Sequence, residues 1–221
     1  MIDSSKNKFL HYVDTHSIHM LLVSILILVF MPPFLGDTDS FIDNFIKFDF
    51  LLIVTTSFLI VRRFKISRYL GVVTFIMIIV DAFLEHDVLN YISQIGLSFL
   101  IIHAFILVLK EAMSLRGDTQ NMILISITGY LIIGLVGGFL AAGLEFWEAN
   151  SYSHSTGMAL DLYSYIYYSF VTMTTLGYGD IIPATEKSQA LALMLVLSGQ
   201  LFLSVIIAIN IAKFMQNKRS S

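Results

Sequence analysis

Residues 167–180 read Tyr-Tyr-Ser-Phe-Val-Thr-Met-Thr-Thr-Leu-Gly-Tyr-Gly-Asp, and this stretch decides the fold. Gly177 and Gly179 alternate in it with residues that carry side chains. Because glycine readily takes left-handed conformations, the alternation predicts a strand whose successive carbonyls point the same way. Rings of such carbonyls can replace the water ligands of a dehydrated potassium ion. An ordinary loop between two helices is the alternative interpretation, but the threonines, glycines and Asp180 fall at the spacing that a carbonyl row requires.

The segment before this strand is apolar and predicts a helix from about Asp161 to Thr172. This helix is too short to cross a bilayer, so we expect it to enter the membrane partway and turn back. The partial negative charge at its C-terminal end would then stabilise a cation at the middle of the membrane. Because one strand cannot encircle an ion, copies of the chain are expected to assemble around an axis.

The composition predicts a membrane protein. Of the 221 residues, 57% are hydrophobic and 13% are charged, which leaves too little polar surface to cover a soluble domain. A spanning helix needs about 20 mainly apolar residues. Six stretches satisfy this, at residues 17–35, 45–61, 69–84, 88–109, 122–146 and 189–214. The expected fold is therefore an all-α membrane protein with six transmembrane helices, a re-entrant pore helix and a filter loop.

The distribution of basic residues predicts the orientation. If the N-terminus is inside, all 13 lysines and arginines except Lys47 and Lys187 fall on the inner side. Basic loops face the cytoplasm, so both termini are expected there, in the plasma membrane or, for a bacterium, the cell inner membrane. The acidic residues gather at the outer face, where they raise the local cation concentration.

Other function classes find little support. The chain has no cysteine, which excludes thiolate metal sites and disulfides. An enzyme is not expected, because no nucleophile constellation or phosphate loop appears in an aqueous segment. The basic run at residues 62–68 is explained by topology and by anionic membrane lipid, and no nucleic acid partner is expected.

Residues 174–180 resemble the pore signature of the potassium channel superfamily, T-x-G-Y/F-G-D, in the register of its six-helix voltage-gated members. The resemblance extends to Gly199, which lies nineteen residues after Asp180, where the family has a hinge in the inner helix. It covers residues 122–214 by specific motifs and residues 17–109 only by helix count. It implies a homotetrameric potassium channel.

The resemblance also implies roles for individual residues. The ion-coordinating row consists of Thr175, Leu176, Gly177, Tyr178 and Gly179, with K⁺ bound by oxygens of the first four. The supporting residues are Tyr167, Tyr168, Thr172, Thr174 and Asp180. Tyr167 and Tyr168 stand where the family often has two tryptophans. Because a phenol can still donate a hydrogen bond from a packed ring, the support is expected to survive with altered reach.

Two residues of the last span are candidates for the gate. Gly199 either allows close packing against a neighbour or forms a bending point, and the resemblance favours bending. Near Ala208 the sequence reads Ile206-Ile207-Ala208 in place of the Pro-x-Pro kink of many relatives. A hydrophobic constriction there would gate by excluding water.

The predicted domains are a cytoplasmic segment (1–16), a voltage-sensor-like four-helix domain (17–110), a cytoplasmic linker (111–121), a pore domain (122–214) and a short cytoplasmic tail (215–221). Voltage sensing needs several arginines inside the membrane, because one charge moved through 100 mV contributes only about 2.3 kcal/mol. Residues 88–109 contain neither arginine nor lysine. We therefore expect little intrinsic voltage dependence.

Several alternatives remain open at this stage. A less selective cation channel, a potassium transporter subunit and a non-conducting membrane scaffold are the rival functions. No cofactor is expected besides the permeant K⁺, and an unidentified regulatory partner is possible. Among ionisable residues, Asp49 and Asp81 are expected to be solvated or paired, His103 neutral and hydrogen-bonded, and His154 solvated. The small residues of the fifth span, at positions 134, 137, 138, 141 and 142, predict close helix packing.

Overall fold

The computed structural model describes residues 18–35, 39–61, 65–84, 92, 95–96, 98–103, 106 and 119–220. The chain divides into two compact units, Met1–Gly117 and Asp118–Ser221. The predicted N-terminal segment, residues 111–118 of the linker and most of the fourth span lie outside the described residues.

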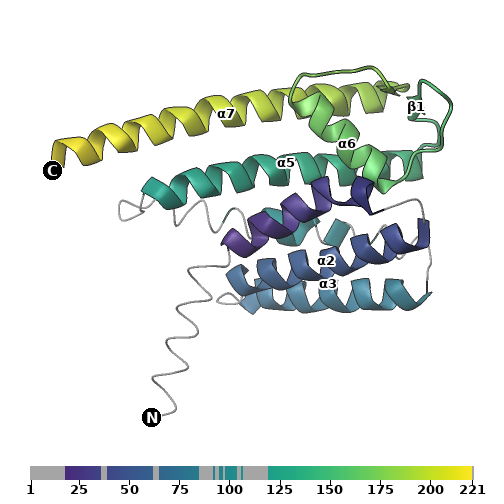
Figure 1. The fold of residues 1–221 in the computed structure, drawn as a ribbon, viewed down its shortest axis with the longest axis horizontal. Coiled ribbons are helices and arrows are strands. Elements are labelled where there is room, and N and C mark those ends of the chain that lie inside the picture. The colour runs from purple at the N-terminus through teal and green to yellow at the C-terminus, as the bar shows by residue number, and fades with distance from the viewer. Residues whose placement is uncertain are drawn as a thin grey trace, which may run out of the picture. The chain divides into compact units, whose positions relative to one another are not determined.

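The described part of the first unit is helical. A helix at Ile18–Phe30 is followed by the short 3-10 helix η1 (Pro32–Phe34), and then by α2 (Asp39–Val61) and α3 (Lys65–Leu84). α2 and α3 pack side by side (Figure 1). The first span was predicted to continue to residue 35, but the α-helix ends at Phe30, because Pro32 has no amide hydrogen to continue the helical hydrogen bonds.

The buried side chains of the first unit are mainly aliphatic, with hydroxyl groups among them. Leu21, Ile25 and Ile53 are almost completely buried. The hydroxyls of Ser24 and Thr56 donate to the carbonyls of Met20 and Leu52, four residues earlier, at 3.0 and 2.9 Å. Hydroxyls that bond within their own helix are compatible with an apolar environment.

Asp49 contradicts the prediction that it is solvated or paired. Its side chain is only 1% exposed, and neither carboxylate oxygen has a hydrogen-bond partner among the described residues. His103 is half-buried, and the side chain of Asp81 lies outside the described residues.

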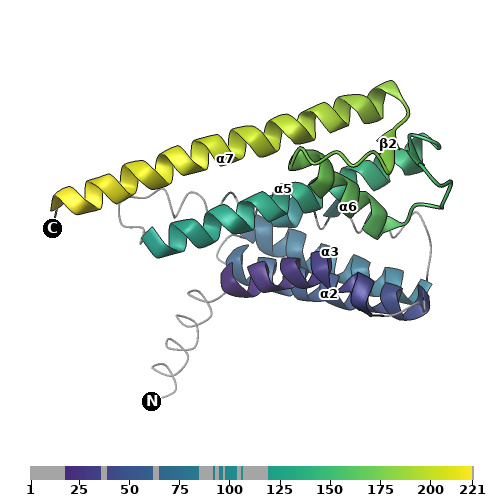
Figure 2. The same ribbon diagram turned by 45° about the horizontal axis from the view of Figure 1, so that its top comes forward.

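The second unit contains three helices and one pair of strands. They are α5 (Thr119–Trp147), β1 (Tyr152–His154), α6 (Leu162–Met173), β2 (Ile181–Pro183) and α7 (Glu186–Ser220). α5 and α7 run antiparallel, and α6 contacts both near the end that carries the strands (Figures 1 and 2). Among the described residues, two helical stretches are long and apolar enough to cross a membrane, Ile123–Trp147 and Glu186–Ile209.

The strand pair is a small addition to a mainly helical fold, which agrees with the predicted all-α class. β1 and β2 are antiparallel, with Tyr152 opposite Pro183 and His154 opposite Ile181. The pair joins the loop after α5 to the segment that follows Asp180. His154 is accordingly half-buried in a strand, which corrects the expectation that it is only solvated.

Small residues on α5 allow α6 to approach closely, as predicted. A Cβ atom added to Gly138 would lie 2.6 Å from the Cα of Ile166, and one added to Gly134 would lie 2.6 Å from Cζ of Phe170. The hydroxyl of Ser169 donates to the carbonyl of Gly134 at 2.7 Å. The close-packing interpretation of this face is therefore confirmed, and it fixes the position of α6 against α5.

Candidate functional site

The segment after α6, residues 174–179, is not one of the β-strands; we call it the carbonyl strand, and its backbone alternates. Thr175, Gly177 and Gly179 have φ angles of 64°, 54° and 77°. The left-handed region is easy for glycine but unusual for a β-branched residue such as threonine. The sequence predicted the glycine conformations, and Thr175 extends the same alternation by one step. Strained backbone of this kind persists only where its surroundings hold it, and it concentrates at functional sites.

The amide groups of this strand turn back towards α6. The N–H groups of Leu176 and Gly177 donate to the carbonyl of Val171 at 3.0 and 3.3 Å, and that of Thr175 donates to the carbonyl of Thr172 at 3.0 Å. In a trans peptide the C=O lies opposite the N–H. The carbonyls of Thr174, Thr175 and Leu176 therefore point away from α6, in one general direction.

The two ends of α6 suit opposite charges. Asp161 caps the N-terminus, where its side chain accepts a hydrogen bond from the Ser164 amide at 2.8 Å. The C-terminal end, at Met173, leads directly into the strand, and the hydroxyl of Thr174 donates to the Phe170 carbonyl at 2.6 Å. The helix therefore presents its partial negative end to the start of the carbonyl row. Thr172 is half-buried beside it.

Tyr167 of α6 is in contact with Asp180, which follows the carbonyl strand. The Tyr167 hydroxyl donates to Oδ2 of Asp180 at 2.7 Å, and the Ile181 amide donates to Oδ1 at 3.0 Å. The hydrogen bond from Tyr167 is the largest cause that holds the pKa of Asp180 below its ordinary value. The same bond raises the pKa of Tyr167 to about 12, so the phenol remains a donor at physiological pH.

Tyr168 points to the other side of α6, into a cluster of tyrosines that the sequence did not reveal. The Tyr152 ring meets those of Tyr168 and Tyr165 edge to face, with centroids 5.0 and 5.6 Å apart. All three are buried. β1 is thus attached to α6 by Tyr152, a residue 16 positions before Tyr168 for which no pattern in the sequence predicted a contact.

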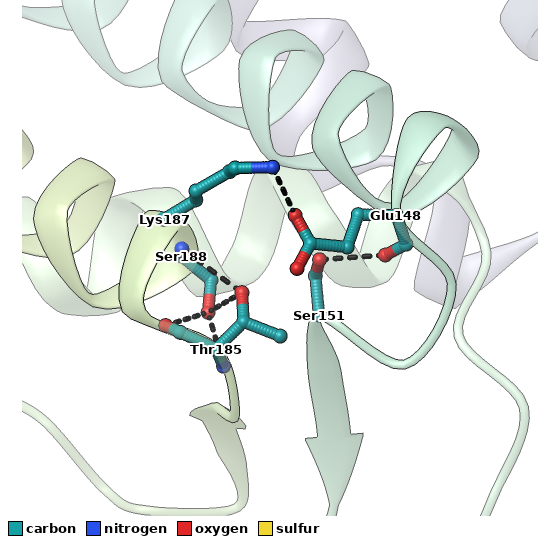
Figure 3. A network of polar contacts seen from close by, with 5 residues as sticks. All are labelled: Glu148, Ser151, Thr185, Lys187 and Ser188. Carbon is teal, nitrogen blue, oxygen red and sulfur yellow. Dashed lines mark hydrogen bonds and ion pairs between the residues drawn. The ribbon is translucent and has the colours of Figure 1, made fainter.

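A polar network joins the end of α5 to the start of α7 (Figure 3). Lys187 pairs with Oε2 of Glu148 at 2.8 Å, and the hydroxyl of Ser151 donates to the Glu148 carbonyl at 2.6 Å. Thr185 and Ser188 cap the start of α7: the Thr185 amide donates to the Ser188 hydroxyl at 3.0 Å, and the Ser188 amide donates to Oγ1 of Thr185 at 3.3 Å.

One side of the carbonyl strand is uncovered in the single chain. Leu176 is 58% exposed and Tyr178 is 67% exposed, whereas Met173, at the end of α6, is completely buried. The long apolar helix α7 is exposed as well, with only 17% of its spanning stretch buried, against 50% for α5. Apolar exposure on this scale marks a surface that contacts lipid or other chains.

The two candidate gate residues have different surroundings. Gly199 is buried, and a Cβ atom there would lie 2.8 Å from the Met173 carbonyl oxygen. The structure therefore gives Gly199 a packing role, inside an α7 that is helical through this position; bending stays a prediction. Ala208 lies on α7 nine residues later and is exposed, so the structure does not bring the two residues together.

Comparison with known proteins finds similarity to ion channels in the second unit. Residues 123–216 match the family model described as "Ion channel". This part of the chain resembles ion channels. The chain is also 32% identical over 72 residues to "Two pore potassium channel c" from Oryza sativa subsp. japonica, an alignment that covers 32% of the chain. The alignment spans only 16% of the length of that curated relative.

The match defines a channel-like region, residues 123–216, which contains α6, the carbonyl strand and nearly all of α5 and α7. The described residues contain no group of three or more His, Cys, Asp or Glu side chains that could hold a metal ion. The oxygens that residues 174–179 themselves carry are backbone carbonyls and the hydroxyls of Thr174, Thr175 and Tyr178.

Proposed function

We propose that the chain is a subunit of a homotetrameric channel that conducts K⁺ passively and selectively. The ion would be bound by the oxygens of Thr175, Leu176, Gly177 and Tyr178. The observation that carries the proposal is the direction of three peptide groups: the amides of Thr175, Leu176 and Gly177 bond to carbonyls at the end of α6, so the carbonyls of Thr174, Thr175 and Leu176 point away from it. Gly177 and Tyr178 are proposed to continue this row. A row of carbonyls that replaces the hydration shell of K⁺ needs this arrangement.

Assembly follows from the uncovered side of the strand. A single strand supplies oxygens on one side of an ion only, so rotational symmetry must supply the others. The exposure of Tyr178 and Leu176 supports this, because these side chains are open in one chain and would be covered by neighbouring copies. The exposed apolar side chains of α7 are distributed over enough of its surface to face both lipid and neighbouring subunits.

The proposal includes a membrane arrangement and a mode of control. Both termini are placed on the cytoplasmic side of the plasma membrane, or of the cell inner membrane in a bacterium. The first unit is proposed to be voltage-sensor-like in helix number but not in charge, because residues 88–109 contain no arginine or lysine. Control would then come from lipid or from an unidentified regulatory partner, with no cofactor beyond the permeant ion.

The test is potassium flux through purified protein in liposomes. With K⁺ on one side and Na⁺ on the other, the reversal potential is expected to follow the K⁺ gradient. Gly177→Ala is expected to abolish this selectivity, because Gly177 has a φ of 54°, where a Cβ atom is strained. Ser198→Ala, at an exposed position of α7, is the matched control. Equal permeability of wild type to both ions would favour the less selective cation channel, and countertransport of a second ion would favour a transporter.

A further inference from the structure

Glu145 lies in the last turns of α5, where a negative charge is unfavourable. The carbonyl groups at a helix C-terminus carry partial negative charge, so an acidic side chain there is repelled. Both oxygens of its carboxylate have hydrogen-bond partners in the protein. Oε1 accepts a hydrogen bond from the Asn150 amide at 2.7 Å, and Oε2 accepts one from the Tyr152 amide at 3.0 Å. Both oxygens thus hold the backbone that leads into β1.

The turn held by Glu145 has a left-handed residue. Asn150 has a φ of 65°, which is uncommon outside glycine but tolerated by asparagine. The Glu145 carboxylate bonds to the amide of this residue and to the amide two residues later. It therefore stabilises the bend that directs Tyr152 onto Tyr165 and Tyr168.

β1 in turn holds the backbone that follows the carbonyl row. The Ser155 amide donates to the Asp180 carbonyl at 2.7 Å, and the Ala184 amide donates to the Ser151 carbonyl at 2.8 Å. These two bonds bracket the β1–β2 ladder. A pair of three-residue strands is not stable by itself, so its position depends on what fixes β1.

Two connections therefore reach Asp180 from different parts of the chain. One comes from α6, through the Tyr167 hydroxyl. The other comes from the end of α5, through Glu145, the bend and the Ser155 amide. The second connection is built from residues that lie outside the pore signature at residues 174–180.

We propose that Glu145 is a positioning residue for the outer end of the carbonyl row, acting through β1 to keep Asp180 and Gly179 in the conducting geometry. It touches no ion. Its loss is expected to let residues 179–184 leave that geometry during conduction. This inference rests on the proposed function, since it assumes that the row conducts.

Glu145→Gln tests the proposal with little change in size. An amide keeps one acceptor oxygen and places an NH₂ group against a backbone amide, so one of the two hydrogen bonds is lost. The matched control is Glu148→Gln, three residues later on the same chain segment, whose carboxylate pairs with the exposed Lys187 instead. Wild type and both variants are reconstituted in liposomes, and the decay of the K⁺ current is recorded at low and at high external K⁺.

The expected result is a current that decays roughly tenfold faster in Glu145→Gln, the rate change produced by losing about one charge-assisted hydrogen bond from the conducting state. High external K⁺ is expected to slow this decay, because ions in the row oppose its rearrangement. The initial reversal potential should stay at the wild-type value, and Glu148→Gln should decay like wild type. Unchanged decay in Glu145→Gln, equal acceleration in both variants, or acceleration insensitive to K⁺ would overturn the proposal.

A second variant covers the case in which Glu145→Gln fails to assemble. Ser155 is exposed and is the second residue of a turn closed by the Gly157 amide and the His154 carbonyl at 2.9 Å, a position that favours proline. Ser155→Pro removes only the amide that bonds to Asp180. It is expected to accelerate the decay as well, and wild-type decay in Ser155→Pro would overturn the proposal.

Hydrogen exchange separates this inference from the proposed function. The amides of Ile181 and Ala184 are expected to exchange faster in Glu145→Gln than in Glu148→Gln, whether or not the protein conducts. Absent K⁺ flux in wild type would refute the proposed function alone. Equal exchange in the two variants would refute the role of Glu145 alone.

Discussion

The Tyr167 hydroxyl lies 2.7 Å from Oδ2 of Asp180 and donates a hydrogen bond to it, so α6 and the residue that ends the carbonyl row are directly connected. Tyr167→Phe removes this bond with little change in packing. We expect it to lower the free energy of unfolding by about 1 kcal/mol at neutral pH, which is less than a buried bond to a charged group contributes because this pair is partly exposed. Thermal unfolding measures this, with the exposed Tyr69→Phe as control.

The same bond predicts a dependence on pH. The pKa of Asp180 is held below its ordinary value, mainly by Tyr167. A carboxyl of this kind stabilises the fold above its unfolded-state pKa, and the contribution is lost as the pH falls through the folded-state pKa. The difference in stability between wild type and Tyr167→Phe should therefore be full at neutral pH and disappear in strong acid. A difference that grows on acidification would contradict this assignment.

Gly199→Ala is expected to destabilise the protein although alanine is the better helix former. The added methyl group would meet the Met173 side chain and lie 2.8 Å from the Met173 carbonyl oxygen. Overpacking of this kind costs about 1–3 kcal/mol, which exceeds the gain of about 1 kcal/mol in helix propensity. Thermal unfolding measures the balance, with Ser198→Ala as control. In a Met173→Ala background the same change should cost less than in wild type, because the Met173 side chain no longer opposes the added methyl group. A stabilised single variant would show that the contact with Met173 gives way.

The ion pair between Lys187 and Glu148 should contribute little to stability. The lysine side chain is 73% exposed and the glutamate side chain 36%. Exposed pairs contribute about 0–1 kcal/mol and weaken with salt. Lys187→Met is expected to change the unfolding free energy by less than about 1 kcal/mol, and by less still at high salt. A larger, salt-independent loss would mean that the pair is shielded from solvent in the assembled protein.

Steep voltage dependence is not expected. Residues 88–109 contain no arginine or lysine, and each charge that moves through 100 mV contributes only about 2.3 kcal/mol. Current recorded over a range of voltages should show open probability that changes little. A steep rise worth several charges per channel would require charged residues elsewhere in the first unit to move through the membrane field.

The carbonyl row and its helix could be predicted from sequence because their signals are local. Gly177 and Gly179 predict a left-handed backbone, which the structure has. Asp161 caps the helix that the sequence predicts to begin there. The close packing at Gly138 was predictable for the same reason, since the absence of a side chain is visible in the sequence itself.

The strand pair could not be predicted in this way. β1 and β2 have three residues each, too few to show alternation, and Tyr152 pairs with Pro183, 31 positions later. The role of Glu145 depends on that pairing and on the left-handed Asn150, so its sequence position alone gives no signal. The buried Asp49 is a different case: it is not solvated, it has no hydrogen-bond partner among the described residues, and its burial becomes visible only in the folded unit.

The bare side of the strand from Thr175 to Gly179 has a genetic consequence. In the proposed tetramer every ion is bound by four copies of the chain, so one defective copy disrupts the ion sites of the whole assembly. If wild-type and Gly177→Ala chains mix at random in equal amounts, only about one assembly in sixteen contains four intact copies. Co-expression should therefore lower the current far below half of the wild-type current. A single defective allele would then have a dominant-negative effect.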